Sequence, residues 1–284
     1  MNPTTPEPPT LAQNIATTHL PPNTIALWWL GQAGVVLRDA SSTIIIDPFL
    51  SEHPDRLVAA PFSPASAPTT DYVLCTHEHI DHFDAKTVAG IAQAMPQTRF
   101  VVPQPMSGQV SALGIAPERI ISAQAYTPLA LNTIKIFPVP ALHGLNSPPT
   151  HYDFGFDEQT GEQHYRYLGY VVEMAGVRIY HAGDTLIYDG MVEHLRSLHI
   201  DIALLPINGR SYFREQKGLV GNMDEREAAD LAAAIGVKML IPVHYDMFAA
   251  NLGRPAVLLD YMQEKHLNLT CVVLAYGQRY TYMA

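Results

Sequence analysis

Cysteine is almost absent from this sequence of 284 residues, in which only Cys75 and Cys271 occur. Two cysteines exclude a disulfide framework and a cysteine-rich zinc module. Charged residues are also scarce, at 15% of the chain, which leaves little material for a disordered charged tail. By contrast the chain contains 13 histidines, so histidine chemistry is a natural starting point.

Positive charge is the scarcer of the two signs. Lys and Arg total 17 against 27 Asp and Glu, a formal net charge of −10. This balance disfavours a nucleic-acid groove or an anionic membrane surface, since both need a positive footprint. We therefore expect a small-molecule substrate, anionic if a local basic pocket exists, and neither a nucleic-acid nor a membrane partner.

Long apolar runs and an early positive segment are missing as well. The first basic residue is Arg38, so the N-terminus lacks the positive region of a signal peptide. No run approaches the roughly 18–20 apolar residues that a membrane span needs. A cytoplasmic location is expected by default.

Residues 1–23 are rich in Pro and Thr and predict an extended N-terminal arm, which would permit a homo-oligomer. Residues 24–284 predict one layered α/β domain. Its early runs 24–30, 34–38 and 43–46 indicate a strand meander, and strands then alternate with helices. Two mixed sheets face to face, with helices outside, would bury this pattern. One of the helices is expected to begin near Asn222, with Glu225 completing a capping box, and to end at Gly236.

The strongest local motif is Thr76-His77-Glu78-His79-Ile80-Asp81-His82, directly after the apolar run 71–75. Neutral imidazoles and carboxylates are preferred ligands of Zn²⁺ and similar ions. Because His77 and His79 alternate on an extended segment, both can point the same way. Asp81 and His82 lie on the turn into the next helix and can face a second position. The cluster therefore indicates two metal ions, against the alternative of a solvated histidine-rich loop.

This motif resembles the H-x-H-x-D-H hallmark of the metallo-β-lactamase superfamily. The resemblance extends over almost the whole chain, through 27–34 (LWWLGQAG), Asp47-Pro48, 181–185 (HAGDT) and 242–246 (PVHYD). It implies the αββα four-layer sandwich of that superfamily. The strand and helix order read from the sequence agrees with it.

The resemblance also implies a ligand set for two divalent ions. The first ion would be held by His77, His79 and His143, the second by Asp81, His82 and His244, with Asp184 bridging them. His181 and Asp47 would orient these ligands from behind. His, Asp and water ligands suit Zn²⁺, Mn²⁺ and Fe²⁺ alike, so the metal stays open.

Within the superfamily the chain looks most like the L-ascorbate-6-phosphate lactonase family, through 27–31, 181–185 and 241–246. That likeness implies a metal-dependent hydrolase that opens a lactone or cleaves an ester, such as that of a phosphorylated sugar acid. Two close ions lower the pKa of a bound water to about 7, giving a hydroxide that attacks the carbonyl. Asp81 is the expected proton carrier, and Asp184 acts with it at the catalytic centre.

Substrate specificity is assigned to the segment after the apolar run 202–206. Arg210 or Arg214 is expected to bind a substrate phosphate or carboxylate, since guanidinium groups suit both. Asn208 and Tyr245 are expected to add hydrogen bonds near the metals. The alternative is a surface loop with ordinary salt bridges.

Three other functions share the motif. A phosphodiesterase, phospholipase-D-like or acting on nucleotides, would use the same ligands, although the net charge disfavours nucleic acid. A redox member of the superfamily would require iron. A non-catalytic scaffold is the third, and intact ligands at every expected position argue against it.

Overall fold

The computed structural model describes residues 9–146, 151–156 and 164–284. Two seven-stranded sheets dominate it. The first has the order β16-β1-β2-β3-β4-β5-β6. Its strands are β1 (Thr24–Gly31), β2 (Gly34–Arg38), β3 (Thr43–Ile46), β4 (Tyr72–Leu74), β5 (Arg99–Pro103), β6 (Ile120–Ala123) and β16 (Arg279–Met283). The predicted meander is confirmed as β1, β2 and β3, which pair antiparallel, whereas β3 to β6 run parallel.

The second sheet has the order β15-β14-β13-β12-β11-β8-β7. Its strands are β7 (Leu129–Leu131), β8 (Ile134–Pro140), β11 (Leu168–Met174), β12 (Val177–His181), β13 (Ile202–Pro206), β14 (Met239–Val243) and β15 (Thr270–Cys271). The strands from β12 to β15 are parallel, and those from β7 to β12 are antiparallel. A separate ribbon pairs β9 (Gly144–Asn146) with β10 (His151–Asp153).

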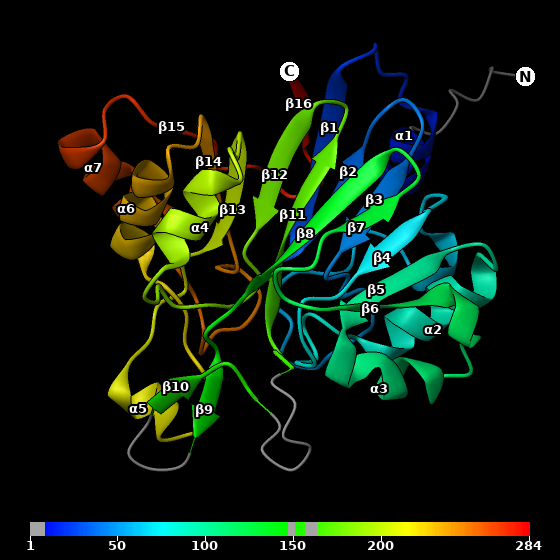
Figure 1. Ribbon diagram of the computed structural model, residues 1–284, viewed down its shortest axis with the longest axis horizontal. Coiled ribbons are helices and arrows are strands. Elements are labelled where there is room, and N and C mark those ends of the chain that lie inside the picture. The colour runs from blue at the N-terminus through cyan, green and yellow to red at the C-terminus, as the bar shows by residue number, and fades with distance from the viewer. Residues whose placement is uncertain (1–8, 147–150, 157–163) are drawn as a thin grey trace, which may run out of the picture.

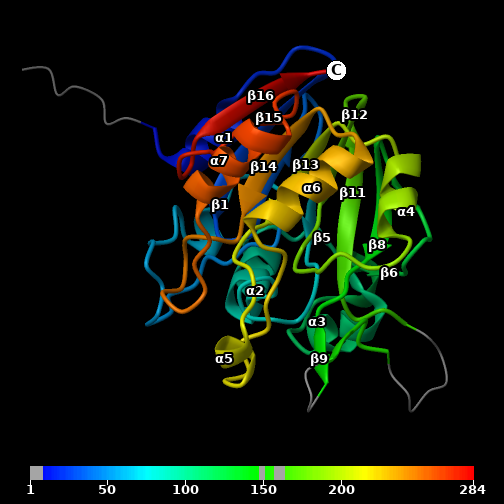
Figure 2. The same cartoon turned by 90° about the vertical axis from the view of Figure 1, so that its left-hand side faces the viewer.

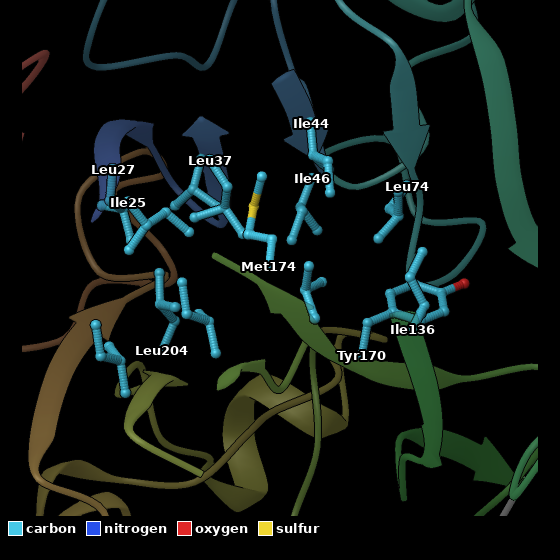
Figure 3. Close-up of a cluster of buried hydrophobic side chains, with 14 of the residues drawn as sticks. Ile25, Leu27, Leu37, Ile44, Ile46, Leu74, Ile136, Tyr170, Met174 and Leu204 are labelled. Carbon is cyan, nitrogen blue, oxygen red and sulfur yellow. The ribbon is translucent and has the colours of Figure 1, made fainter. Parts of the chain in front are cut away.

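The main core lies between the two sheets. Alternate residues of each strand point inward, as the two-residue period of a strand requires, and they form one buried cluster. Figure 3 shows Leu37 and Ile46 of the first sheet facing Met174 and Leu204 of the second. Each fully buried side chain of this kind contributes about 1.5–3 kcal/mol relative to exposure. This shared core fixes one sheet against the other.

Helices cover the outer face of each sheet (Figures 1 and 2). On the first sheet these include α2 (Ala85–Ala94) and α3 (Ser107–Ser111). On the second they are α4 (Met191–Ser197), α6 (Glu225–Ile235) and α7 (Pro255–Lys265), and α5 (Tyr212–Glu215) lies apart near β9 and β10. The predicted αββα sandwich is confirmed. No helix in the described part of the chain is both long and apolar enough to cross a bilayer.

The predicted extended arm over residues 1–23 is wrong for its middle part. Residues Leu11–Thr17 form helix α1, and residues 1–8 lie outside the described part. Thr10 and Gln13 close a capping box at its start, and Ile15 is fully buried against the first sheet. The Thr-x-x-Gln spacing at residues 10–13 is typical of a capping box, and this pattern in the sequence indicates the helix.

The start of α6 also differs from the prediction. Its N-cap is Asp224, not Asn222, and Glu227, not Glu225, completes the capping box. Asp224 accepts hydrogen bonds from the backbone N–H groups of Arg226 and Glu227, both at 2.9 Å. The predicted end at Gly236 is confirmed, because that residue has a left-handed φ of 76°. Asn222 is instead fully buried and its amide donates to Asn208.

We expect Asp224→Ala to lower the free energy of unfolding by about 1 kcal/mol, because two N–H groups lose their acceptor. Asp224→Asn keeps a capping oxygen and should remain close to the wild type. Urea unfolding followed by circular dichroism measures both. Equal loss in the two variants would show that the cap is not the stabilising feature.

Candidate metal centre

The predicted ligands converge because they follow the carboxyl ends of strands in both sheets. The segment 77–82 follows β4 of the first sheet. Asp184 follows β12 and His244 follows β14 in the second sheet. His143 follows β8, where its backbone N–H donates to Asp153 O at 3.1 Å. The shared core that holds the sheets together therefore also sets the distance between these four segments.

His77, His79, His143 and Asp184 form the first group. Their ligand atoms all lie within 4.8 Å of one another. His77 Nε2 is 2.9 Å from His79 Nδ1, and His143 Nε2 is 3.1 Å from the same atom. The prediction that His77 and His79 face the same way is therefore correct. Tyr167 packs its ring against all three histidines.

Asp81, His82 and His244 form the second group, again within 4.8 Å. A helical turn, in which His82 N–H donates to His79 O at 2.9 Å, carries Asp81 and His82 away from the first group. His244 Nε2 is 3.2 Å from Asp81 Oδ2. Asp184 adjoins both groups, because Oδ1 is 3.3 Å from His82 Nε2 and Oδ2 is 3.4 Å from His143 Nε2. That is the position of a bridging carboxylate.

The donor set fits divalent cations. In the first group three ring nitrogens face one another, which hydrogen bonds between the rings cannot all satisfy. Around a tetrahedral ion with bonds of about 2.0–2.1 Å, neighbouring ligand atoms are roughly 3.3 Å apart, close to the distances seen here. His82 Nε2 and Asp184 Oδ1 are buried 3.3 Å apart, yet neither atom forms a hydrogen bond in the described structure. Buried polar atoms of this kind normally have a partner, and an ion would supply it.

Burial in the first group keeps its three imidazoles in the uncharged form that can bind a metal ion. Burial lowers the pKa of His143 to about 3. Burial, with His82 and the other imidazoles adding to it, holds the pKa of His77 well below its usual range. Burial also lowers the pKa of His79. All three rings are therefore neutral at pH 7, the form that offers a lone pair to a metal.

The second group is dominated by its carboxylates. Burial raises the pKa of Asp184, but His244 and His82 outweigh burial and leave it well below its usual value. The same balance lowers the pKa of Asp81. Burial lowers the pKa of His244, yet Asp184 and Asp81 bring it to about 9. The carboxylates are thus ionised, and positive charge beside them stabilises this ionised form.

Asp47 orients the second group from behind, as predicted. It is fully buried after β3, and His82 Nδ1–H donates to its Oδ2 at 2.7 Å. Thr76 N–H and Thr76 Oγ1–H donate to the same carboxylate at 2.8 and 2.7 Å. Because Nδ1 of His82 holds its proton toward Asp47, Nε2 is left free to face the cluster.

His181 also acts from behind the ligands. Its Nε2–H donates to Ala33 O at 2.7 Å, and Nδ1 accepts from Gly183 N–H at 3.1 Å. Gly183 has a φ of 61°, and a Cβ there would lie 2.8 Å from Thr76. Only glycine tolerates this approach, which brings the Asp184 segment against the segment that begins at Thr76.

Gln32 is a site residue that the sequence reasoning missed. It is fully buried in the turn after β1, and its Nε2–H donates to Asp81 Oδ2 at 2.7 Å. The same nitrogen is 3.1 Å from His244 Nε2, and Gln32 O accepts from His244 N–H at 2.8 Å. The backbone N–H of Gln32 donates a hydrogen bond to Asp246 Oδ1 at 2.8 Å. The turn 31–34 was noted only for its likeness to the family.

Three of these residues share an unusual backbone conformation. Gln32, Asp47 and His244 have φ values of 50°, 48° and 59°. Non-glycine residues in this left-handed region cost about 1–3 kcal/mol each, and such strain persists where the surroundings over-determine it. His244 belongs to the second group, and Gln32 and Asp47 hydrogen-bond to it, so the strain is concentrated where ligand direction matters.

A cavity of about 660 Å³ opens over the ligands. His79, Asp81, His143, Asp184 and His244 form part of its wall. This size lies within the roughly 300–1,000 Å³ of small-molecule sites. The other parts of the wall come from 53–57, Ile80, 218–220 and 248–251.

The predicted substrate-binding residues do not line this cavity. Arg210 forms a two-bond ion pair with Glu227, at 2.6 and 2.8 Å. Arg214 donates to Asn208 O at 2.8 Å and to Asn251 Oδ1. Tyr245 stacks on Trp29 with ring centres 4.9 Å apart.

The prediction of anion binding by Arg210 or Arg214 is therefore corrected: both guanidinium groups are committed to other parts of the chain. Asn208 and Arg214 instead hold Asn251, which does line the cavity. A basic loop in an acidic protein was taken as a binding site, whereas its charges are used for structure. Sequence spacing alone did not reveal Glu227 as the partner.

Comparison with known proteins agrees with this site. A family model described as "Beta-lactamase superfamily domain" matches residues 42–245. A UPF0173 metal-dependent hydrolase of Pyrococcus furiosus is 30% identical over 244 residues, covering 85% of this chain and 93% of that protein. One from Methanosphaerula palustris is 32% identical over 232 residues, covering 79% and 85%. The chain therefore belongs to the UPF0173 family of metal-dependent hydrolases, within the beta-lactamase superfamily.

Solved structures share the fold. Igni18, a metallo hydrolase of Ignicoccus hospitalis, has a TM-score of 0.70 at 20% identity and covers 92% of this chain and 99% of its own. An isothiocyanate hydrolase from Delia radicum gut bacteria has a TM-score of 0.71 at 20% identity, covering 91% and 100%. At such identities the likeness supports the metallo-β-lactamase fold and nothing finer.

Divalent ions should stabilise the folded protein, because the unfolded chain has no preformed ligand set. At a free concentration 100 times the Kd, each ion contributes about 2.7 kcal/mol. We expect Zn²⁺ or Mn²⁺ added to chelator-treated protein to raise the Tm by several degrees in calorimetry, with Ca²⁺ as the control. A Tm that no transition-metal ion shifts would contradict the site.

Gln32→Ala should weaken one of the two metal positions by about 10–100-fold, the usual effect of losing a group that holds a ligand. Competition titration with a chromogenic chelator would resolve this as one weakened step. Gln278→Ala, which removes an exposed turn glutamine, is the matched control. Two unchanged steps would mean that Gln32 does not position Asp81 and His244.

Proposed function

We propose that this chain holds two divalent ions and hydrolyses a carboxylic ester or lactone of a small molecule. The observation that carries the proposal is Asp184, on the wall of a cavity, whose carboxylate lies 3.4 Å from His143 in the first group and 3.3 Å from both His82 and His244 in the second. The first ion would be held by His77, His79 and His143, and the second by Asp81, His82 and His244. The likeness to L-ascorbate-6-phosphate lactonases supports a carbonyl as the reacting group.

When bound, the ions supply a water acidic enough to serve as the nucleophile at neutral pH and stabilise negative charge on the attacked carbonyl oxygen. Asp81 reaches the cavity with a side chain that is 14% exposed, while Gln32 holds its Oδ2. It is therefore placed to accept a proton and pass it to the leaving alkoxide. Asp184 contacts both ligand groups and so fixes the distance between them.

The test is a substrate panel on metal-loaded protein with elemental analysis of the same sample. Carboxylic esters and lactones should be hydrolysed, and bis(p-nitrophenyl) phosphate should not. Cleavage of the phosphodiester alone would favour the phosphodiesterase alternative. Oxidation chemistry with iron as the bound metal would favour the redox alternative.

His79→Ala and Asp184→Ala should each lower kcat/KM by more than about a hundredfold and lower metal content, since ligand loss exceeds the 10–100-fold effect of outer partners. His266→Ala is the matched control, because this histidine pairs with Asp230 and not with the cluster. Normal turnover by a metal-replete His79→Ala protein would refute the assignment.

A further inference from the structure

The wall of the cavity beyond the metal-binding groups is largely apolar. It includes Leu57, Ile80, Leu219, Val220 and Phe248. These come from four separate segments of the chain, which the fold brings together over the ligands. Single exposed apolar residues are ordinary on a protein surface, whereas a group of them around one hollow marks a binding site.

Two of these side chains are unusually exposed for their size. Ile80 is 52% exposed and stands between the ligands His79 and Asp81, and Leu57 is 56% exposed. Neither side chain is buried in a core, so core packing does not account for an aliphatic residue at either position. Covering them with a hydrocarbon removes apolar surface from water, at about 25 cal/mol per Å².

Positive charge on the described wall is confined to one arginine, Arg56, whose Nη2 is buried without a hydrogen-bond partner. Its guanidinium donates to Phe49 O at 2.7 Å, Val58 O at 3.0 Å and Ser51 O at 3.1 Å. It also lies 4.4 Å over the Phe49 ring. Asp55 adds a carboxylate, with a side chain that is 78% exposed.

We propose that the cavity binds an uncharged hydrocarbon substituent of the substrate and selects against a charged one. The reacting carbonyl then lies at Asp81 and Asp184, and the substituent lies along Ile80, Leu57 and Phe248. This assignment rests on the proposed ester or lactone hydrolase and specifies its substrate class. A phosphate or carboxylate at the far end of the substituent would lose hydration without gaining a cation.

Binding tests the proposal independently of turnover. The probes are acetohydroxamate, butanohydroxamate, hexanohydroxamate and octanohydroxamate, whose head group chelates metal ions. Titration calorimetry on the Zn²⁺-loaded protein should show affinity rising by up to about fourfold per methylene, the effect of burying one such group. The monohydroxamate of suberic acid matches octanohydroxamate in length but ends in a carboxylate, and should bind at least tenfold more weakly. An affinity independent of chain length, or equal binding of these two, would overturn the proposal.

Variants locate the effect on the cavity wall. Leu57→Ser and Ile80→Ser should each reduce the gain per methylene. Ile80→Ser could lower metal content because Ile80 lies between two ligands. Leu57 is separate in sequence from the ligand segment, so Leu57→Ser tests the cavity wall without that complication. Leu267→Ser is the matched control, since Leu267 is 80% exposed and lies away from the cavity. The same slope in Leu57→Ser and Leu267→Ser would contradict the proposed wall.

Hydrolysis of p-nitrophenyl esters from acetate to octanoate separates the two proposals. A kcat/KM that rises with chain length supports both. Hydrolysis of acetate with no rise overturns the hydrocarbon cavity and leaves the esterase. No hydrolysis of any ester or lactone, with hydroxamate affinity still rising, overturns the esterase and leaves the hydrocarbon cavity.

Discussion

The structure depends on a concentration of electron-pair donors whose burial is costly unless positive charge lies between them. Imidazole nitrogens and carboxylate oxygens of seven residues lie in two groups, each within 4.8 Å. Most of these side chains are buried, where unpaired polar atoms are costly. Positive charge placed between these atoms would offset that cost. Asp184 contacts both groups, so the two metal positions adjoin each other. Asp47 accepts a hydrogen bond from His82 and Gln32 donates one to Asp81, which keeps these ligands facing inward, while His181 accepts from the Gly183 N–H beside Asp184.

The two sheets meet this constraint by placing strand ends together. The first sheet supplies the segment from His77 to His82, and the second supplies His143, Asp184 and His244. One core joins the sheets, so the ligands inherit a fixed spacing although the sequence separates them widely. The left-handed conformations of Asp47, Gln32 and His244 show that local backbone preference gives way to this arrangement.

Much of this was predictable from the sequence, for physical reasons. Strand periodicity located β1, β2, β3 and β4, and the compact His and Asp motif identified four ligands because their chemistry is unusual at that spacing. His143, Asp184 and His244 came from family likeness, and the structure brings them to the predicted places. Gln32 was missed because a buried amide has no distinctive sequence pattern. Arg210 was misassigned because its partner Glu227 lies 17 residues away and nothing in the spacing shows the pairing.

The residues that line the cavity indicate that substrate specificity depends on apolar surface and not on charge. Arg214, outside the cavity, supports the loop that carries Asn251, while Ile80 and Leu57 present aliphatic surface beside the ligands. Affinity for substrate would then grow with buried hydrocarbon, and the ligand groups would supply the chemistry.

The central claim is that these side chains hold a pair of ions in two adjoining positions. Anomalous diffraction from crystals of the metal-loaded protein tests it most directly. The account predicts two peaks, one among His77, His79 and His143 and one among Asp81, His82 and His244, with Asp184 between them. A single peak, or peaks away from these residues, would contradict it.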